Sequence, residues 1–505
     1  MTQERLHPLF QAERRPDHPA QHFVHADGSL TTLSYAELAD AILRGAQLLR
    51  RLGLRRGDGL VVLSENRPEV LPLYWAAQLA GLWYTPVSVQ FGHAEIGHIL
   101  RDCDARLLII SATQEAKLAS THFPQEIVYS LDAGRQWPHW SKALQGEPTS
   151  WIADASEGAE MLYSSGSSGL PKGVCQTPPG GPPGVVTDFL RQRMARHAVD
   201  ADMRYLSTQP LYHSAPLRYN VMAHRVGATA LVMARFEPRL TLNLLEQHRI
   251  THSQWVPTMF VRLLRLPEAE RLGWNFQDHR FALHAAAPCP IAVKAAMLDW
   301  WGPILHEFYS GTEGNGQTTI SPEEWRQRPG SVGRPIQGRI HIVDEQGNPL
   351  PAGETGLVYF EGGPAFSYYK DPAKTAASRH PAGWTTLGDI GHVDEAGYLY
   401  LSGRAGQVIN SGGLKVYPAE VENCLLEHSA VQDAAVIPAP DPEFGQRVRA
   451  LVVPAEGISA DEVLVARLQA HCRARLAHFK CPRQIEFRAE LPRHETGKLY
   501  HRLIE

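Results

Sequence analysis

The sequence is poor in the features that mark several common protein classes. Its 505 residues contain only 6 cysteines, none of them in a Cys-x-x-Cys pair. This excludes a disulfide scaffold and a cysteine-rich metal site and favours reduced thiols. A net charge of −4 argues against a positively charged surface for binding nucleic acid. The 24 histidines show no metal-ligand spacing.

Long apolar runs are also missing. The most apolar stretch, residues 71–87, is broken by Pro72, Gln78 and Pro86, which favours a core helix and a strand over a membrane span. Residues 1–5 are polar and mixed in charge, unlike a secretory signal. We therefore expect a cytoplasmic protein without a transmembrane segment. A chain of 505 residues with 43% hydrophobic content predicts two or more domains, one of them large.

Short apolar segments alternate with helical patterns in the first quarter of the chain. Residues 60–63, 84–87 and 106–111 predict buried strands, and Ser34-Tyr-Ala-Glu37 has the spacing of a capping box at a helix start. Asn66 is expected to cap the helix before the second strand. This alternation favours an α/β fold with a largely parallel sheet.

The pattern changes near residue 330. Turn signals between residues 333 and 403 predict an antiparallel β region. The last ~100 residues predict a compact α+β domain, a size that can fold alone. We therefore expect a large N-terminal domain, residues 1–403, made of α/β sheets plus the β region, and a small C-terminal domain, residues 404–505.

Residues 163–174, Tyr-Ser-Ser-Gly-Ser-Ser-Gly-Leu-Pro-Lys-Gly-Val, combine small hydroxyl-bearing residues with one cation. The serines offer neutral donors, the glycines let the backbone expose its N–H groups, and Lys172 adds a positive charge. Such a loop suits a triphosphate. It is not a Walker A loop, because Lys172 is followed by Gly173. A flexible linker would have a similar composition.

Four further stretches follow this loop along the chain. They are Pro210-Leu-Tyr-His213, Glu307-Phe-Tyr-Ser-Gly-Thr-Glu313, Gly383-Trp-Thr-Thr-Leu-Gly-Asp389 with Gly403-Arg404, and Glu495-Thr-Gly-Lys498. Together the five resemble the adenylate-forming superfamily of acyl- and aryl-CoA synthetases, luciferase and the adenylation domains of peptide synthetases. The resemblance runs from about Ser34 to the end of the chain, and the stretch from Ser411 to Glu422 is most similar to the CoA ligases.

The resemblance implies a nucleotide site and a thiol site. The Ser/Gly loop would hold the β- and γ-phosphates of ATP, Asp389 would accept hydrogen bonds from the ribose hydroxyls, and Tyr309 would stack on adenine. The implied nucleotide-binding residues are Ser164, Ser165, Gly166, Ser167, Ser168, Gly169, Lys172, Ala286, Tyr309, Ser310, Gly311, Thr312, Asp389 and Arg404, and Gly412 and Gly413 would face CoA.

The resemblance also assigns four residues to catalysis. Lys498 would bridge the substrate carboxylate and the α-phosphate, where positive charge suits the developing transition state. Thr312 would donate to the α-phosphate, and Glu313 would bind the Mg²⁺ that bridges phosphate oxygens. His213 would line or gate the acyl pocket. The plainer alternatives are a solvated lysine, strand-end residues and a satisfied core histidine.

The chain departs from the family at the hinge and after the Ser/Gly loop. Gly406 stands where the family has an acidic or lysine hinge residue, and glycine keeps rotation of a mobile small domain accessible. Thr177 is followed by Pro178 where Thr-His is common. Asn410 and Ser411 replace residues that contact CoA in other members.

The implied reaction has two steps. A carboxylic acid and MgATP give an acyl-adenylate and pyrophosphate, and CoA then takes the acyl group and releases AMP. Two other functions remain open: transfer to an amine or a carrier protein, and a silent homologue that only binds ligand. The silent homologue is disfavoured because the sequence keeps every residue that the reaction needs: Lys172, Thr312, Glu313, Asp389 and Lys498.

The acid itself is suggested only by apolar residues near the expected pocket. Leu217, Tyr219, Met222 and Phe281 favour a medium-chain, aromatic or alicyclic acid. A homodimer would be unsurprising.

Overall fold

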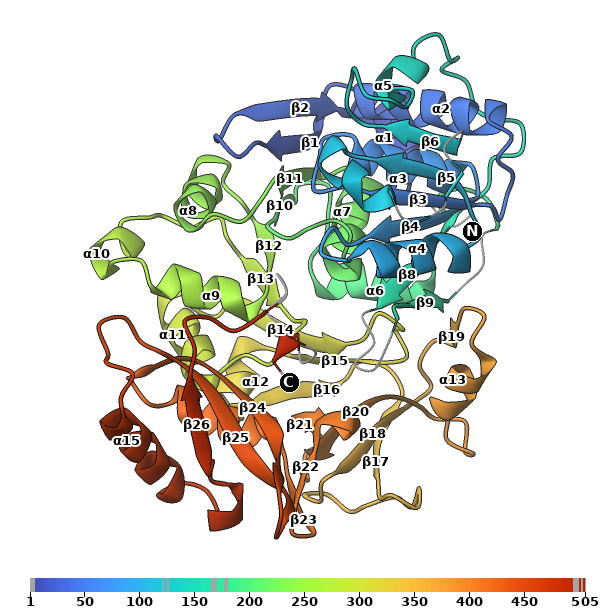
Figure 1. Ribbon diagram of the computed structural model, residues 1–505. Helices are drawn as coiled ribbons and strands as arrows, with labels where there is room; N and C mark the ends of the chain where they lie inside the picture. Colours follow the sequence, from blue (N-terminus) through green and yellow to red (C-terminus); the bar gives the residue numbers. More distant parts are fainter. Residues whose placement is uncertain are drawn as a thin grey trace. The chain divides into compact units, whose positions relative to one another are not determined.

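The computed structural model describes residues 5–119, 121, 123–124, 127–164, 170–176, 180–493, 499–500 and 503–504 (Figure 1). The chain forms two compact units. Met1–Trp255, Glu268–Ala282 and Ala365–Thr375 make the first, and Val256–Pro267, Leu283–Pro364 and Ala376–Glu505 make the second. The two units are defined by which residues pack together, and such a division does not locate a hinge. The expected domain boundary between residues 403 and 404 therefore stays a prediction.

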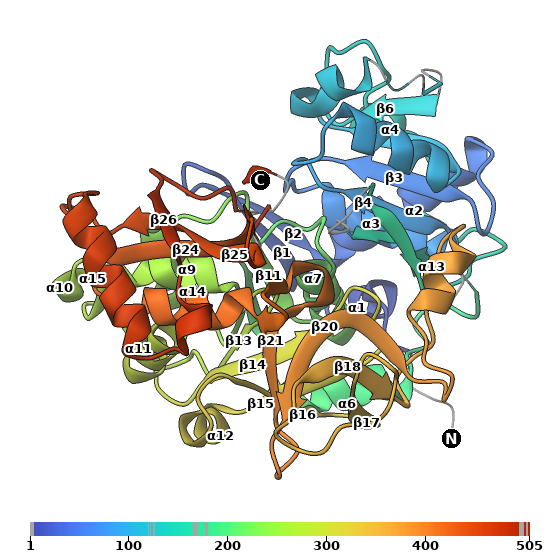
Figure 2. The ribbon, with the colours of Figure 1, turned by 60° about the horizontal axis from the view of Figure 1, so that its bottom comes forward.

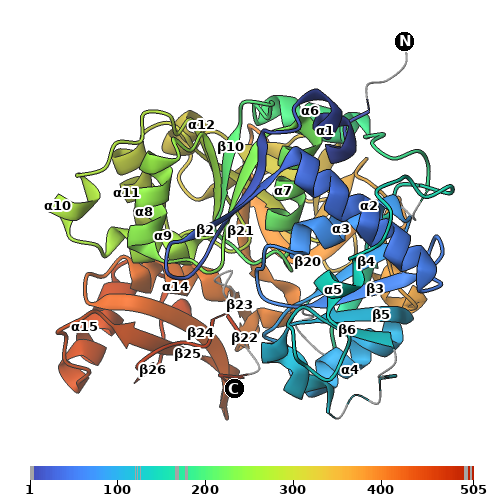
Figure 3. The same ribbon diagram turned by 90° about the horizontal axis from the view of Figure 1, so that it is seen from above.

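The first unit contains the parallel sheet that the alternating pattern predicts. Its order is β6-β5-β3-β4-β7, and all neighbours are parallel. Ile96, Ile99 and Leu100 pack one face of α4 against this sheet, and α2 and α3 lie on its other side (Figure 3). The elements are β3 (Gly59–Leu63), β4 (Trp83–Val87), β5 (Ala105–Ile110), β6 (Val128–Ser130), β7 (Ala159–Glu160), α2 (Tyr35–Arg51), α3 (Val70–Leu79) and α4 (His93–Asp102).

Two local predictions in this unit had different outcomes. The capping box is confirmed: Ser34 accepts from the N–H of Glu37, whose carboxylate accepts from the N–H of Ser34. The predicted Asn66 cap is wrong, because α3 begins at Val70. The Asn66 side chain instead donates to the carbonyls of Gln209 (3.1 Å) and Met233 (2.8 Å). Its Oδ1, the atom that a cap would use, accepts from the N–H of Leu211 at 2.7 Å, so a tertiary partner takes the place of the helix N–H.

A second set of strands in this unit runs in the order β12-β10-β11-β1-β2. The β1–β11, β10–β11 and β10–β12 pairs are parallel and β1–β2 is an antiparallel hairpin. The unit's other elements are α1 (Pro8–Arg14), β1 (Pro19–Val24), β2 (Leu30–Ser34), η1 (Ala112–Leu118), α5 (Trp140–Ala143), β8 (Leu162–Ser164), β9 (Lys172–Cys175), α6 (Asp188–Arg196), β10 (Arg204–Ser207), α7 (Ser214–Val226), β11 (Thr229–Met233), α8 (Pro238–Gln247), β12 (His252–Trp255), α10 (Glu268–Arg271) and β19 (Ser367–Tyr368).

The second unit contains the antiparallel region predicted after residue 330. Its strand order is β17-β18-β20-β21-β16-β15-β14, and the described pairs are antiparallel. The elements are β14 (Leu305–Ser310), β15 (Gln317–Ile320), β16 (Ser331–Pro335), β17 (Arg339–Val343), β18 (Gly356–Glu361), β20 (Thr385–Val393), β21 (Leu399–Arg404), η3 (Ala405–Gln407), α9 (Pro257–Leu264), α11 (Ile291–Trp301) and α12 (Pro322–Gln327); β13 (Phe281–His284) and α13 (Pro372–Ala377) cross from one unit to the other.

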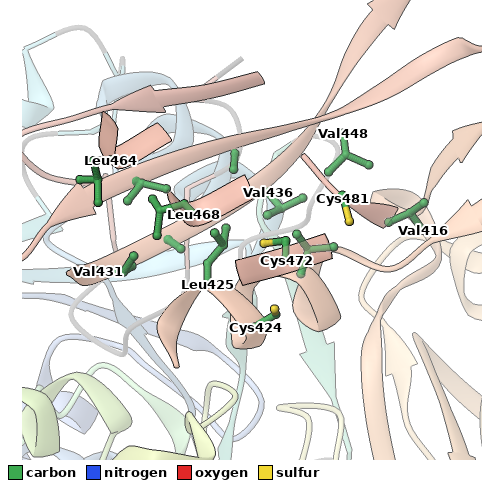
Figure 4. Close-up of a cluster of buried hydrophobic side chains, with 14 of the residues drawn as sticks. Val416, Cys424, Leu425, Val431, Val436, Val448, Leu464, Leu468, Cys472 and Cys481 are labelled. Atoms are coloured by element: carbon green, nitrogen blue, oxygen red, sulfur yellow. The ribbon is translucent and has the colours of Figure 1, made fainter. Parts of the chain in front are cut away.

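The end of the second unit is the predicted α+β arrangement (Figure 2). The order β23-β22-β25-β24 is extended by β26, which pairs with β25 in parallel. Leu425, Leu464 and Cys472 belong to the core between the two helices and the sheet (Figure 4). The elements are β22 (Ile409–Ser411), β23 (Leu414–Val416), α14 (Pro418–Leu426), β24 (Val431–Asp441), β25 (Gly445–Pro454), α15 (Glu462–Arg473), η4 (His478–Lys480) and β26 (Gln484–Phe487).

Two sequence expectations about composition can be compared with the described residues. All six cysteines lie among them and are free, and burial raises the pKa of Cys472 to about 12, which suits packing thiols and not reactive ones. Within the described part of the chain, no helix has both the length and the apolarity that a membrane crossing requires.

Glu422 gives the C-terminal sheet and helix a pH-dependent stability. Its carboxylate accepts from the N–H of Val436 at 2.8 Å, and burial raises its pKa to about 7. Because the folded pKa lies above that of the unfolded chain, the contribution of Glu422 is largest at low pH and is lost as pH rises through about 7.

We predict that Glu422→Gln stabilises the protein relative to wild type more at pH 8 than at pH 5. The glutamine oxygen still accepts from Val436, but no charge is buried at high pH. Thermal unfolding at both pH values measures the difference. Glu462→Gln, at an exposed position on α15, is the control and should show the same shift at both pH values; an equal shift in Glu422→Gln would contradict the prediction.

Candidate functional site

The base of the Ser/Gly loop is an antiparallel strand pair in the first unit. Ser164 at the end of β8 lies opposite Lys172 at the start of β9, and Tyr163 lies opposite Gly173. The Tyr163 hydroxyl donates to Asp102 at 2.5 Å, and a Cβ on Gly173 would come within 3.0 Å of the Tyr163 ring. The two ends of the loop are therefore held together, with Ser164 and Lys172 adjacent.

The residues expected at the acyl pocket also lie in the first unit. His213 is the N-cap residue of α7, and its ring meets that of Tyr212 edge-on at 4.6 Å. Leu217, Tyr219 and Met222 follow on α7 and are at most 1% exposed. The Tyr219 hydroxyl is hydrogen-bonded to His197 Nδ1 at 2.9 Å. These three side chains therefore pack in the core of the unit.

A buried carboxylate connects three residues of the second unit that are expected to bind nucleotide. Asp389 on β20 is 7% exposed and lies opposite Arg404 in the β20–β21 register. The hydroxyl of Tyr309 donates to one oxygen at 2.5 Å, and Arg404 Nε donates to the other at 3.0 Å. Each oxygen keeps acceptor capacity, as ribose hydroxyls would need. Burial and Asp389 raise the pKa of Tyr309, so it remains a neutral donor.

Tyr309 thus has a role that the sequence did not suggest. We expected its ring to stack on adenine. Its hydroxyl also fixes Asp389, and its ring centroid lies 6.1 Å from that of Phe360; stacking on adenine stays a prediction. Because its hydroxyl is hydrogen-bonded to Asp389, the Tyr309 side chain cannot rotate freely, and the orientation of its ring is fixed before any base binds.

The loop after β14 brings Thr312 and Glu313 to the same region. Ser310 Oγ donates to the carbonyl of Gly316 at 2.7 Å and closes the turn. Glu313 is 8% exposed, and its carboxylate folds back so far that a Cβ on Gly311 would lie 2.7 Å from Oε2. Glycine at 311 therefore permits the position of Glu313, beside the half-buried Thr312.

Ala286 follows β13 in a backbone conformation that is unusual for alanine. Its φ is 78°, and the residue is exposed after the buried Ala285. This places a small side chain at the surface of the second unit, where a flat ligand could approach the backbone.

A buried charge cluster that sequence patterns missed lies beside this turn. Lys294 on α11 is fully buried and forms an ion pair with Glu307 on β14, and His284 Nε2 lies 3.4 Å from the same carboxylate. Burial acts to raise the pKa of Glu307, but Lys294 and His284 outweigh it and hold the pKa below its usual value. His284 precedes Ala285, and Glu307 precedes Tyr309 by two residues, so the cluster links both nucleotide segments.

Gly412 and Gly413 form a two-residue hairpin turn between β22 and β23. Their φ values are 59° and 82°, and Ser411 pairs with Leu414. Positive φ at both central positions defines the type I′ turn, which side chains other than Gly, Asn and Asp rarely adopt. The turn is exposed and its Gly412 N–H donates to Phe444 at 2.9 Å, so it presents bare backbone.

Several predicted site residues lie outside the described residues. They are Ser165, Gly166, Ser167, Ser168, Gly169 and Lys498, together with the departure at Pro178.

The carboxylate of Glu313 would suit a Mg²⁺ ion whose other ligands come mainly from a bound nucleotide. Among the described residues, no three His, Cys, Asp or Glu side chains gather as a metal cage. Glu313 offers one nearly buried carboxylate. Magnesium is commonly bound through one or two carboxylates plus substrate phosphates, and it keeps several waters.

Comparison with known proteins identifies the family. The model described as AMP-binding enzyme matches residues 10–369, and the one described as AMP-binding enzyme C-terminal domain matches residues 420–498. The chain belongs to the AMP-binding enzyme family.

Similar proteins cover nearly the whole chain. A feruloyl-CoA synthase of an Amycolatopsis species is 32% identical over 482 residues, 93% of this chain and 92% of that protein. A 2-succinylbenzoate–CoA ligase of Geobacillus kaustophilus is 30% identical over 475 residues, 94% and 93% of the two chains. The ATP-bound MatB structure from Rhodopseudomonas palustris matches with a TM-score of 0.83 and 26% identity, over 99% of this chain and 98% of that one.

These findings confirm the adenylate-forming superfamily and the α/β fold with its large N-terminal and small C-terminal parts. They also confirm the class of AMP-forming acid–thiol ligase, with ATP and CoA as substrates. An amide bond synthetase, McbA of Marinactinospora thermotolerans, shares the fold at a TM-score of 0.82 and 24% identity, over 98% of this chain and 99% of that one.

We predict that Lys294→Met destabilises the protein by about 3–5 kcal/mol, because it leaves the Glu307 carboxylate buried without its ammonium partner. Chemical denaturation measures the loss. The double variant Lys294→Met/Glu307→Gln should recover part of it.

Lys370→Met is the matched control, since Lys370 pairs with Asp104 at 2.7 Å where the two side chains are 46% and 63% exposed. It should cost less than about 1 kcal/mol. A similar loss in both lysine variants would show that burial of the Lys294 pair does not matter.

Proposed function

We propose that the protein converts an aromatic carboxylic acid to its CoA thioester, with adenylation catalysed by Lys498, Thr312 and Glu313. The observation that carries the acid class is the 32% identity to a feruloyl-CoA synthase over 93% of this chain. An indoleacetate–CoA ligase at 28% identity also acts on an aromatic acid.

In the first step, a carboxylate oxygen forms a bond to the α-phosphorus while the bond from that phosphorus to pyrophosphate breaks. Lys498 neutralises the charge that gathers between the carboxylate and the phosphate. Thr312 donates its hydroxyl to the α-phosphate, and Lys172 stays with the departing pyrophosphate. Glu313 would hold the Mg²⁺ ion, which when bound would neutralise charge on the phosphate oxygens.

In the second step, the CoA sulfur bonds to the acyl carbon, the thiol proton is lost, and the bond to AMP breaks. The backbone of the Gly412–Gly413 turn lies beside the thiol, and Asp389, Tyr309 and Arg404 keep hold of the AMP ribose. The hydrogen bonds already made to Asp389 support this role, because they fix the carboxylate before any ligand arrives.

The two steps use different placements of the small domain, residues 404–505, which turns about Gly406. Gly406 is exposed, and a Cβ there would meet nothing within 4 Å, so this conformer alone does not require glycine. Lys415 pairs with Glu345 at 2.5 Å, but the side chains are 48% and 71% exposed, so this ion pair opposes rotation weakly. The family matches end at residue 369 and resume at residue 420, on either side of the proposed hinge.

Cytoplasmic location and a homodimer stay predictions.

We predict pyrophosphate release that becomes multiple-turnover only when an aromatic acid and CoA are both present. The panel is ferulate, indoleacetate, benzoate, octanoate and cyclohexanecarboxylate, each with and without CoA. Faster release with octanoate than with any aromatic acid would overturn the acid class. Turnover supported by an amine or a carrier protein in place of CoA would overturn the acceptor.

We predict that Lys498→Ala lowers adenylation by about 10²-fold or more, because it removes a preorganised charge. Thioester formation from a supplied acyl-adenylate should be retained. Lys480→Ala, on η4 of the same domain, is the control and should leave both steps unchanged. Unchanged adenylation by Lys498→Ala would contradict its assigned role.

We predict that Gly406→Pro separates the two half-reactions, because proline fixes φ and restricts the residue before it. One half-reaction should be retained while the other falls. Gly406→Ala should leave both steps close to wild type, since the site has room for a Cβ. An equal fall in both steps with Gly406→Pro, at unchanged stability, would argue against a hinge here.

A further inference from the structure

The strand pair β8–β9, which carries Lys172, is supported by the helix α4 (Figure 1). His98 on α4 donates from Nε2 to the carbonyl of Pro171 at 3.0 Å, directly before Lys172. At the end of α4, Asp102 Oδ2 accepts from the hydroxyl of Tyr163 on β8 at 2.5 Å. One helix of the first unit therefore contacts both arms of this hairpin.

The two faces of the hairpin differ in what they hold. Tyr163 lies opposite Gly173, and Ser164 lies opposite Lys172. Side chains alternate along a strand and opposite residues share a face, so Ser164 and Lys172 lie on the face away from Tyr163. A Cβ on Gly173 would come within 3.0 Å of the Tyr163 ring, so the ring lies across this glycine. Tyr163 thus fastens one face to α4, and Lys172 stands on the other.

A second tyrosine–aspartate pair lies next to the first and is more exposed. Tyr369 follows β19, the strand that pairs with β9, and its hydroxyl donates to Asp104 Oδ2 at 2.9 Å. The Asp104 side chain is 63% exposed, whereas Asp102 and Tyr163 are both half-buried. Burial, and after it the hydrogen bond to Asp102, raise the pKa of Tyr163, so its hydroxyl stays protonated and donates. A hydrogen bond to a charged acceptor is stronger where water is partly excluded.

We propose that Tyr163, held by Asp102, is a positioning residue that fixes Lys172 for the β- and γ-phosphates of ATP. This inference rests on the proposed role of Lys172 at the departing pyrophosphate. Lys172 pairs with Ser164, which is joined by one peptide bond to Tyr163. The contact to Asp102 therefore holds the strand pair from which the lysine side chain extends. A lysine binds phosphate as a point charge on a flexible stem, so the place of its backbone decides which oxygens it can reach.

The contact should matter for one half-reaction and for only some ligands. ATP and inorganic pyrophosphate carry the phosphates that Lys172 would meet, whereas AMP and an acyl-adenylate do not. A weakened contact therefore lowers the affinity for ATP and pyrophosphate and spares both AMP binding and transfer of the acyl group to CoA. Because the residues expected at the acyl pocket lie in the same unit as Tyr163, a general disturbance of that unit would slow transfer as well.

The test uses the full chain with Tyr163→Phe, Asp102→Ala and Asp102→Asn. Calorimetry gives the Kd of MgATP and of AMP, ATP–pyrophosphate exchange gives the KM of pyrophosphate, and transfer is measured with CoA and the synthetic adenylate of the acid that turns over fastest in the panel. We expect Tyr163→Phe and Asp102→Ala to raise the Kd of MgATP and the KM of pyrophosphate by about 5-fold or more, the loss of roughly one hydrogen bond. AMP binding and transfer should stay within about 2-fold of wild type. Asp102→Asn should lose less, because its amide oxygen can still accept from the Tyr163 hydroxyl.

Tyr369→Phe and Asp104→Asn are the matched controls. They change the same kinds of group in the neighbouring, more exposed pair and leave the Tyr163 contact in place. Both variants should bind MgATP, pyrophosphate and AMP as wild type does. A loss of MgATP affinity in Tyr369→Phe equal to that in Tyr163→Phe would show that the Tyr163 contact has no particular role, which would overturn the proposal.

Combination with Lys172→Met shows whether Tyr163 acts through the lysine. In the Lys172→Met background, Tyr163→Phe should change the Kd of MgATP by less than about 2-fold, because the group that it positions is gone. Additive losses in the double variant would mean that Tyr163 acts on ATP by another route, and they would contradict the inference.

The outcomes also separate this inference from the proposed function. Equal weakening of MgATP and AMP in Tyr163→Phe, or slowed transfer, would make Tyr163 a structural residue and overturn the proposal. Wild-type binding of MgATP by Tyr163→Phe, together with weak binding by Lys172→Met, would overturn the positioning role and keep the role of Lys172. If Lys172→Met binds MgATP as wild type does, the proposed role of Lys172 fails, and the positioning role fails with it.

Discussion

The second unit depends on a contact that a flat sheet could not make. Tyr309 on β14 donates to Asp389 on β20, yet β15, β16 and β21 lie between these strands in the sheet order. Four strand spacings would separate the two residues by roughly 19 Å if the sheet were flat. The sheet must therefore curl until β14 approaches β20, and the buried carboxylate accepts from one donor on β14 and one on the neighbouring strand β21. The same curl brings the loop after β14 to β20, where the Asn315 amide reaches Thr385 at 3.3 Å.

Buried charged residues also join elements of this unit, next to the segments expected to bind nucleotide. The Lys294–Glu307 ion pair is directional and joins α11 to β14, and His284 Nε2 of β13 lies 3.4 Å from the same carboxylate. Trp325 completes the enclosure with its ring 4.8 Å from the ammonium. Such a cluster is costly to bury, and its value lies in specifying one arrangement.

Local chemistry was predictable from sequence and long-range pairing was not. The Ser34–Glu37 capping box and the antiparallel region after residue 330 follow from neighbouring residues and are present in the fold. Asn66 has the composition of a cap, but the backbone groups of Gln209, Leu211 and Met233 lie close enough to take its amide. The partners of Lys294 and Arg493 lie 13 and 60 positions away in sequence, and no periodicity connects them. Motif spacing indicated that Asp389 and Arg404 belong to one site, whereas only the fold shows that Tyr309 joins them by its hydroxyl.

The C-terminal sheet holds two contacts on one frame of paired strands. The Gly412–Gly413 turn is joined to β25 through the Ser411–Gly445 pair, and Arg493 is joined to β24 through its two contacts with Asp433. The β24–β25 pairing runs from Val431 to Asp441 with one irregularity between Val431 and Asp433. For the two-step reaction proposed above, we therefore expect this sheet to move as one body about Gly406, because continuously paired strands resist local bending more than a single glycine does.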